Sequence, residues 1–163
     1  MKNKILVVAL IFLIPYTLYL IPSFSQNTRL WATYYGETGI DYGNSITTDA
    51  SGNVYLAGTT ESANAIALGG FQNTIGGNRD AYLVKFSATG IRLWATYYGG
   101  TGDDWGLSTV VDALGNVYLA GYTFSAFGIS SGGFHNTVGG SGCDAFLVKF
   151  NSTGTRLWAT YYG

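Results

Sequence analysis

The chain has 163 residues, a net charge of −1, many Gly and Tyr residues and few charged ones. No cluster of Lys and Arg is present, so we expect neither nucleic acid nor an anionic membrane surface as a partner. A single cysteine, Cys143, excludes an intrachain disulfide framework, and stability is therefore expected to come from packing.

The N-terminal residues 1–25 have the pattern of a secretory signal peptide. Lys2 and Lys4 precede an apolar stretch from Ile5 to Ile21, and a cut after Ser25 has small residues at its −3 and −1 positions. An uncleaved anchor is the alternative, because the apolar stretch approaches the length of a membrane span. Cleavage leaves no stable membrane span, which predicts a secreted or cell-surface protein.

One octapeptide, Arg-Leu-Trp-Ala-Thr-Tyr-Tyr-Gly, occurs three times, at residues 29–36, 92–99 and 156–163. The stretch after the first copy aligns with the stretch after the second, apart from a one-residue insertion. Self-similarity at a fixed period is typical of solenoids, propellers and repeat arrays. The sequence therefore predicts two repeats, residues 26–91 and 92–155, and the first strand of a truncated third repeat at the last octapeptide.

Each repeat contains four segments rich in β-branched and aromatic residues and separated by turn signals, and no stretch after residue 26 has a helical period. The predicted strands are 30–35, 44–48, 53–60 and 81–86 in the first repeat, and 93–98, 107–111, 116–123 and 145–150 in the second. We predict an all-β fold of β-propeller type, with blades of four antiparallel strands, two blades plus one extra strand. In this interpretation the octapeptide forms the first strand of a blade.

Within these strands the alternation of side chains predicts how the blades pack. The three tryptophans of the octapeptide, Trp31, Trp94 and Trp158, are expected to be wedges between adjacent blades. Lys85 and Lys149 recur in the last predicted strand of each repeat, where a lysine would blunt an exposed sheet edge.

Six recurring aspartates, among them Asp41 and Asp104, are expected to be structural, because a catalytic site breaks the symmetry of a repeat. Asp49 and Asp112 each begin an Asp-x-x-Gly sequence, the preference of a type I turn. Asp80 and Asp144 each precede the last predicted strand of a repeat.

The other polar residues considered for chemistry offer little. His135 has no Cys, Asp or second His at ligand spacing, so we interpret it as a solvated loop histidine. Cys143 is interpreted as an incidental thiol. Asp103 and Asp104 do not match the spaced acidic loop that provides the oxygens of a calcium site. We predict no enzymatic activity, no cofactor and no metal site.

The long connections at residues 61–79 and 124–143 differ most between the repeats, and loops of this length often carry function. A ligand is expected there first, at the following residues: Glu61, Phe71, Arg79, Phe124, Phe127, Phe134 and His135. The expected ligand is an unknown protein or a glycan.

Three linked motifs in each repeat resemble those of the SBBP repeats of bacterial exported and cell-surface proteins. They span Trp31–Asp41, Asp49–Ser62 and Asp80–Phe86, and again Trp94–Asp104, Asp112–Ser125 and Asp144–Phe150. The resemblance implies a propeller of about seven blades and no particular activity.

Two blades are too few to close a propeller. We expect the chain to be a fragment of a longer repeat protein, and the alternative is a ring of several protomers. The function predicted from the sequence is that of an exported, non-catalytic propeller repeat protein, a structural or protein-interaction module at the bacterial cell surface. The alternative is a carbohydrate- or ligand-binding propeller, closed by oligomerisation of two-blade chains.

Overall fold

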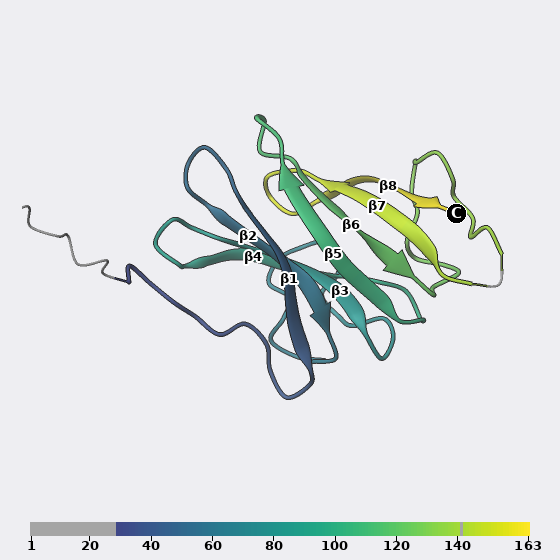
Figure 1. Cartoon of the computed structure of the whole chain (residues 1–163), viewed down its shortest axis with the longest axis horizontal. Helices are drawn as coiled ribbons and strands as arrows, with labels where there is room; N and C mark the ends of the chain where they lie inside the picture. Colours follow the sequence, from purple (N-terminus) through teal and green to yellow (C-terminus); the bar gives the residue numbers. More distant parts are fainter. Residues whose placement is uncertain (1–28, 141) are drawn as a thin grey trace, which may run out of the picture.

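A computed structural model describes residues 29–140 and 142–163 of the chain (Figure 1). The predicted signal peptide lies outside the described residues. Within the described part, no helix is long and apolar enough to cross a membrane.

Eight strands form two four-stranded antiparallel sheets, each with its strands in chain order. The first sheet contains β1 (Asp41–Thr48), β2 (Val54–Thr60), β3 (Asp80–Phe86) and β4 (Arg92–Tyr98). The second contains β5 (Asp104–Val111), β6 (Val117–Thr123), β7 (Asp144–Phe150) and β8 (Arg156–Tyr162). The predicted all-β fold, with blades of four antiparallel strands, is confirmed.

The order of the strands corrects the prediction that the octapeptide forms the first strand of a blade. The second and third octapeptides form β4 and β8, which pair with β3 and β7 and so close their sheets. The third copy is therefore part of a complete sheet. The predicted strand 30–35 is wrong, because these residues belong to no strand of the described chain. The predicted repeat boundaries consequently fall inside the sheets, before β4 and before β8.

The predicted Asp-x-x-Gly turns connect the first two strands of each sheet. Asp49 Oδ1 accepts hydrogen bonds from the backbone N–H groups of Ser51 (2.9 Å) and Asn53 (3.0 Å). Gly52 has a φ of 76°, in the left-handed region that a residue without Cβ adopts most easily. The same bonds to Asp112 recur in the second sheet, so the turn chemistry comes from the sequence itself.

The predicted edge role of the two lysines is wrong, because β3 and β7 lie inside their sheets. Lys85 Nζ lies 3.7 Å from Asp49 Oδ2 and 5.0 Å from the centre of the Tyr55 ring, and Lys149 has the equivalent surroundings. The lysines thus connect the middle of each sheet to the turn between its first two strands.

The long connections cover the outer edges instead. The backbone of Leu68 bridges that of Ala95 in β4, and Gln72 bridges Tyr97. The second blade repeats this arrangement along β8. Because an open edge presents unpaired N–H and C=O groups, this cover explains part of the length of the connections.

Each sheet has two faces, which we call leading and trailing by their order along the chain. The leading face of the first sheet is formed by Val54, Leu56, Tyr82, Val84, Phe86, Ala95 and Tyr97. Its trailing face is formed by Tyr55, Ala57, Ala81, Leu83, Lys85, Trp94, Thr96 and Tyr98. Strand pairing places the members of each set on one side of the sheet.

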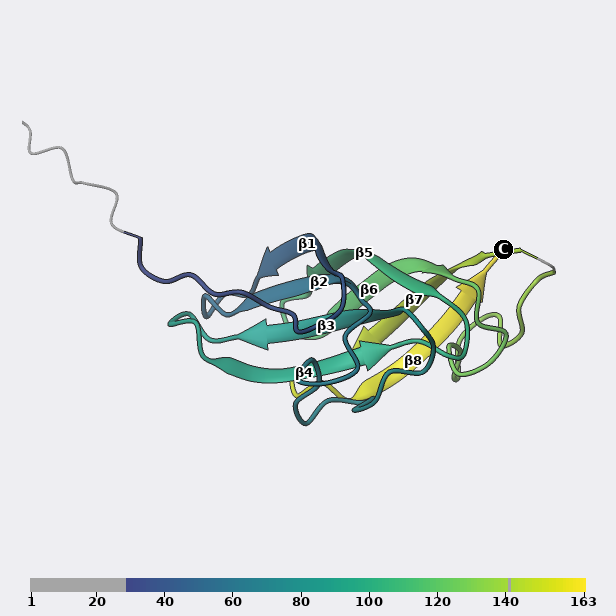
Figure 2. The same ribbon diagram turned by 90° about the horizontal axis from the view of Figure 1, so that it is seen from below.

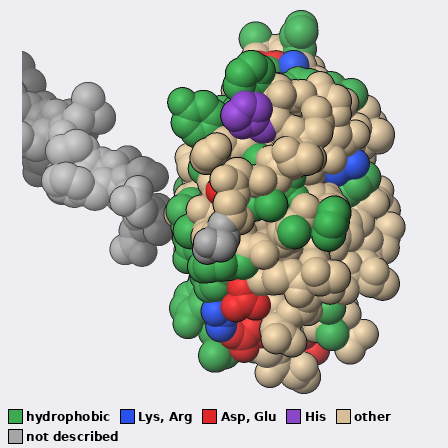
Figure 3. All heavy atoms as spheres, turned by 90° about the vertical axis from the view of Figure 1, so that its right-hand side faces the viewer, with side chains coloured by type: hydrophobic (Ala, Val, Ile, Leu, Met, Phe, Trp, Pro, Cys, Tyr) green, Lys and Arg blue, Asp and Glu red, His purple; other side chains and the backbone are tan. Residues whose placement is uncertain are grey.

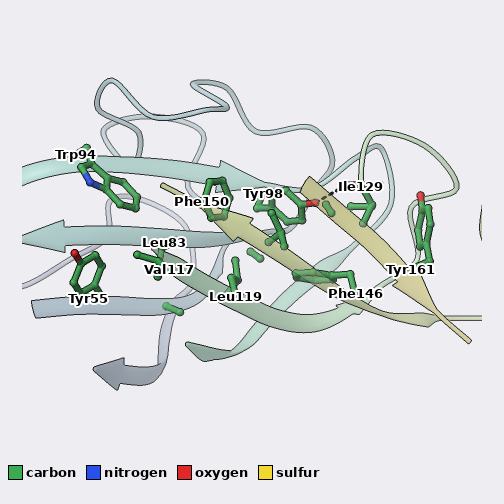
Figure 4. Close-up of a cluster of buried hydrophobic side chains, with 14 residues drawn as sticks. Tyr55, Leu83, Trp94, Tyr98, Val117, Leu119, Ile129, Phe146, Phe150 and Tyr161 are labelled. Carbon is green, nitrogen blue, oxygen red and sulfur yellow. Dashed lines mark hydrogen bonds between the residues drawn. The ribbon is translucent and has the colours of Figure 1, made fainter. Parts of the chain in front are cut away.

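The larger core lies between the sheets, where the trailing face of the first packs on the leading face of the second (Figure 4). The Tyr98 ring lies 5.2 Å from that of Phe146 and meets the Phe150 ring edge-on at 5.8 Å. Trp94 Nε1 donates to the carbonyl oxygen of Ser152 (3.0 Å), so this tryptophan lies between the blades.

A smaller core lies under the first octapeptide, on the leading face of the first sheet. Tyr35 packs 5.1 Å from Tyr82 and meets Phe86 edge-on at 5.8 Å. Trp31 Nε1 donates to the carbonyl oxygen of Ala88 (3.1 Å). Residues 29–36 therefore lie against the first blade much as β4 lies against the second (Figure 2).

Candidate functional site

Side chains that do not recur between the blades gather at one place where the two sheets meet. We call this group the inter-blade cluster: Glu61, Arg79, Asp103, Trp105, Tyr122 and Phe124. The backbone holds its parts together, because the N–H of Asp104 at the start of β5 donates to the carbonyl oxygen of Arg79 (2.8 Å). Three of the seven residues predicted for a ligand, Glu61, Arg79 and Phe124, belong to this cluster.

Arg79 is the centre of the inter-blade cluster. Its guanidinium forms a hydrogen-bonded ion pair with Glu61 and lies 3.8 Å from a carboxylate oxygen of Asp103. The hydrogen bond to Glu61 raises the pKa of Arg79 above its ordinary value. The guanidinium carbon also lies 5.0 Å from the centre of the Trp105 ring, within the range of a cation–π contact.

Three aromatic rings form the other half of the cluster. Trp105 and Tyr122 are direct partners across the β5–β6 pair, and their rings stack with centres 4.8 Å apart. The Phe124 ring meets Trp105 edge-on at 6.0 Å and is about half exposed. The cluster thus presents a charged fork beside an exposed aromatic ring.

Trp105 and Tyr122 were not among the residues predicted to bind a ligand. A signal was present in the sequence, since their counterparts in the first repeat are Tyr42 and Thr59. Tyr42 and Trp105 are both aromatic, whereas Thr59 and Tyr122 differ in size and chemistry. Only the structure shows that Tyr122 stacks on Trp105 and that Trp105 lies against Arg79.

The other predicted loop residues lie elsewhere. The Phe71 ring lies 4.2 Å from the guanidinium carbon of Arg156 and so links the first long connection to the start of β8. Phe134 stacks on His135 with ring centres 4.4 Å apart, and Phe127 is exposed. Figure 3 shows the side of the molecule that carries the histidine, where hydrophobic side chains are scattered among polar ones.

The buried carboxylates at the strand ends are occupied by hydrogen bonds from the chain itself. Asp104 Oδ2 accepts from the Ser125 hydroxyl and from the backbone N–H of Gly100, both at 2.9 Å. Thr123 donates to the other oxygen of the same carboxylate. Burial raises the pKa of Asp104. Asp41 has the equivalent partners in the first blade.

Asp80 ties the first long connection to β3. Its carboxylate accepts from Gln72 Nε2 (2.8 Å) and from the N–H groups of Gly76 (2.9 Å) and Gly77 (3.2 Å). Burial raises the pKa of Asp80 to about 6, although these hydrogen bonds act in the opposite direction. The carboxylate of Asp144 accepts the equivalent bond from the N–H of Gly139 (2.7 Å).

Residues 29–140 and 142–163 contain no cluster of side chains that could serve as metal ligands. No group of three or more His, Cys, Asp and Glu side chains there is arranged to hold an ion. Cys143 is an exposed free thiol.

A comparison with protein families identifies the repeat. Residues 30–64 match the SBBP family model, described as a beta-propeller repeat. These residues are an SBBP repeat. The SBBP match begins in the first octapeptide and ends just after β2, so it runs from the strand position that closes one blade into the first half of the next. No curated protein matches the sequence.

Proposed function

We propose that this SBBP repeat chain is an exported, non-catalytic structural or protein-interaction module at the bacterial cell surface. The hydrogen bonds that its buried carboxylates accept from the chain itself support this proposal. Asp80 and Asp104 accept hydrogen bonds from strand ends and turns of their own chain, whereas a catalytic acid or base must reach a substrate atom. Large aromatic side chains such as Tyr98, Phe146 and Phe150 pack one blade on the next.

Export is supported by the sequence of residues 1–25, with its basic start, apolar stretch and small residues before Gln26. The test is to express the full chain with a C-terminal epitope tag in a bacterial host. We expect an intact mass that begins at Gln26, and loss of the tag when protease is added to intact cells. A tagged protein that keeps its first 25 residues and stays in the cytoplasm would overturn the proposal.

A matched control breaks the apolar stretch. The double substitution Ile11→Arg and Leu13→Arg leaves the folded residues unchanged but removes the hydrophobic region that export needs. This variant is expected to stay in the cytoplasm with its tag protected. An uncleaved chain in the membrane fraction would instead identify residues 5–21 as an anchor.

Carbohydrate binding is a second candidate, favoured by the inter-blade cluster. An exposed ring such as Phe124 offers a stacking surface to the apolar face of a sugar, and Arg79 and Glu61 beside it offer a donor and an acceptor to hydroxyl groups. A glycan array tests this candidate directly. We expect a hit that Phe124→Ala abolishes and Phe127→Ala, at an exposed ring outside the cluster, leaves intact. An array without hits removes the candidate.

A further inference from the structure

The trailing faces of the two sheets share most of their residue types. The trailing face of the second sheet is formed by Tyr118, Ala120, Ala145, Leu147, Lys149, Trp158, Thr160 and Tyr162. Residue by residue, these eight are the same types as the eight named for the first sheet. The two faces differ elsewhere, because Tyr122 and Val110 stand where Thr59 and Thr47 lie on the first. A surface that accepts the first trailing face therefore meets the same eight side chains on the second, together with a larger one at Tyr122.

The leading faces are matched as well. The leading face of the second sheet is formed by Val117, Leu119, Phe146, Val148, Phe150, Ala159 and Tyr161. Among these seven positions, the first sheet differs only in having Tyr82 where the second has Phe146. The edge strands differ more, because Ile46 and Thr48 of β1 stand where Thr109 and Val111 lie in β5. The interface between the blades thus pairs two surfaces that the chain carries twice in most of their side chains.

The second copies of these two surfaces are used differently. In the described chain the second trailing face is open: Tyr162 is 73% exposed, whereas its counterpart Tyr98 is fully buried. Ala145 is exposed and Leu147 half-buried, whereas their counterparts in β3 are buried. A surface that is buried in one blade and exposed in the other is a candidate interface.

In residues 29–140 and 142–163, the first leading face is covered by residues 29–36 and by Ile66, Ala67 and Ile75 of the first long connection, and no second sheet packs on it. The Tyr35 hydroxyl donates to the carbonyl oxygen of Ile66, just as the Tyr98 hydroxyl donates to that of Ile129 in the second blade. One segment without a sheet behind it leaves Val54 and Leu56 half-buried, whereas their counterparts in β6 are fully buried.

We propose that a second copy of this chain binds head to tail, with the trailing face of its second sheet on the leading face of the first sheet. Residues 29–36 are then an intramolecular competitor that the incoming β8 displaces. The inference deepens the proposed function, on which it rests, by naming the chain itself as a partner of the interaction module.

Continuity with the interface inside the chain supports the second copy as the occupant. In that arrangement the incoming Tyr162 hydroxyl donates to Ile66 and the incoming Trp158 indole donates to Ala88. These are the two carbonyl oxygens that Tyr35 and Trp31 now occupy. The two segments therefore exclude each other, and the affinity for a second copy is reduced by the fraction of molecules in which residues 29–36 are docked.

At one of the places where the faces differ, a hydrogen bond is lost. Asn44 Nδ2 donates to the carbonyl oxygen of Gly106 across the interface inside the chain (2.8 Å), and the residue equivalent to Asn44 in the second blade is Leu107. The contact between copies lacks this hydrogen bond. We expect it to be weaker than the contact between blades and to depend on protein concentration.

The test makes the same substitution, tryptophan to alanine, in the first and in the third octapeptide. Sedimentation velocity is measured over a concentration series for the purified chain and for Trp31→Ala and Trp158→Ala. Trp31→Ala weakens the competitor and is expected to tighten self-association by about threefold to fivefold. Trp158→Ala removes a contact from the docking face and is expected to weaken self-association by about tenfold or more.

Tyr162→Arg supplies a second variant that does not depend on a tryptophan cavity. Its side chain is exposed in the single chain, so circular dichroism and the melting temperature are expected to stay unchanged while association is lost, because docking would bury an unpaired charge. Head-to-tail contacts also predict species larger than dimers.

The proposal is overturned by a chain that stays monomeric at every concentration, by association that stops at a symmetric dimer, or by Trp31→Ala and Trp158→Ala shifting it in the same direction. These measurements use purified protein and leave the export experiment unaffected. Failure of self-association and failure of export are therefore separate results.

Discussion

The first and second octapeptides have the same eight residues but different structures. In β4 the chain pairs with β3, Trp94 is 5% exposed and Tyr98 is fully buried. In residues 29–36 no strand forms, and Leu30 and Tyr34 are almost fully exposed. Local propensity is the same in both copies, so the difference comes from the sheet and the neighbouring blade around β4.

The third octapeptide lies between these extremes. As β8 it pairs with β7, but its trailing face is open in the described chain, and Trp158 is half-buried. The three copies thus separate two contributions to the burial of the same eight residues. One is hydrogen-bonded pairing with a neighbouring strand of the sheet, and the other is packing against the next blade. Substitutions at equivalent positions measure each contribution.

The largest expected effect is at the tryptophan. Trp94→Ala opens a cavity between the two sheets and removes the hydrogen bond to Ser152, and it is expected to lower the free energy of unfolding by about 3–5 kcal/mol. Trp31→Ala, on a half-exposed side chain, is expected to cost about 1 kcal/mol or less. Urea denaturation of both variants gives the comparison. Equal losses would show that residues 29–36 contribute as much to folding as β4 does.

The next largest effect on stability is expected around Gly99, the last residue of the second octapeptide, and it depends on pH. A Cβ on Gly99 would lie 2.5 Å from Asp104 Oδ2 and 2.6 Å from Asp80 Cγ, so this glycine lies between two buried carboxyl groups. The first and third copies each place only one aspartate at this close range of their last glycine. A charge-dependent contribution to stability is therefore expected at the second copy.

The sign follows from the pKa of Asp80, which burial raises from 3.8 to about 6. The folded state binds the proton more tightly than the unfolded state, so the contribution is fully present below about pH 4 and is lost as the pH rises through 6. We expect the free energy of unfolding to fall by about 2–3 kcal/mol across this window. Asp80→Asn is expected to flatten the slope, whatever it does to the absolute stability.

Asp49→Asn is the matched control for this slope. Burial acts to raise the pKa of Asp49, but hydrogen bonds from Asn53 and Tyr55 outweigh it and hold the pKa below its ordinary value. The contribution of Asp49 is therefore present above about pH 4 and is lost only at lower pH. Denaturation between pH 4 and 7 is expected to keep the wild-type slope in this variant. A slope that persists in Asp80→Asn would assign the effect to another group.

Much of this fold was predictable from the sequence because its signals are local. The Asp49 turn, the alternation along β2 and the four-strand count all follow from residues close together in the chain. Whether the octapeptide forms the first or the last strand of a blade was not predictable in this way. Whether an octapeptide opens or closes a sheet depends on pairing with β3, which follows the long connection, and the periodicity of a repeat is the same for either phase.

The candidate site was predicted only in part for a similar reason. Glu61, Arg79 and Phe124 stood out because their counterparts differ strongly in chemistry. Trp105 replaces another aromatic residue, and its importance comes from its position beside Arg79, a residue of the other blade. Contacts between blades join residues from different repeats, so a comparison of one repeat with the next does not reveal them.

The smallest expected effect isolates one hydroxyl group. The Tyr98 hydroxyl is buried and donates to Ile129, and Tyr98→Phe leaves that carbonyl oxygen without this donor, at an expected cost of about 1–2 kcal/mol. The Tyr35 hydroxyl makes the same bond to Ile66 in a half-exposed position, where water replaces the lost donor, so Tyr35→Phe is expected to cost about 0.5 kcal/mol or less. Urea denaturation measures both losses. If Tyr35→Phe costs as much as Tyr98→Phe, residues 29–36 are held as firmly as β4, and the easy displacement on which head-to-tail binding depends is contradicted.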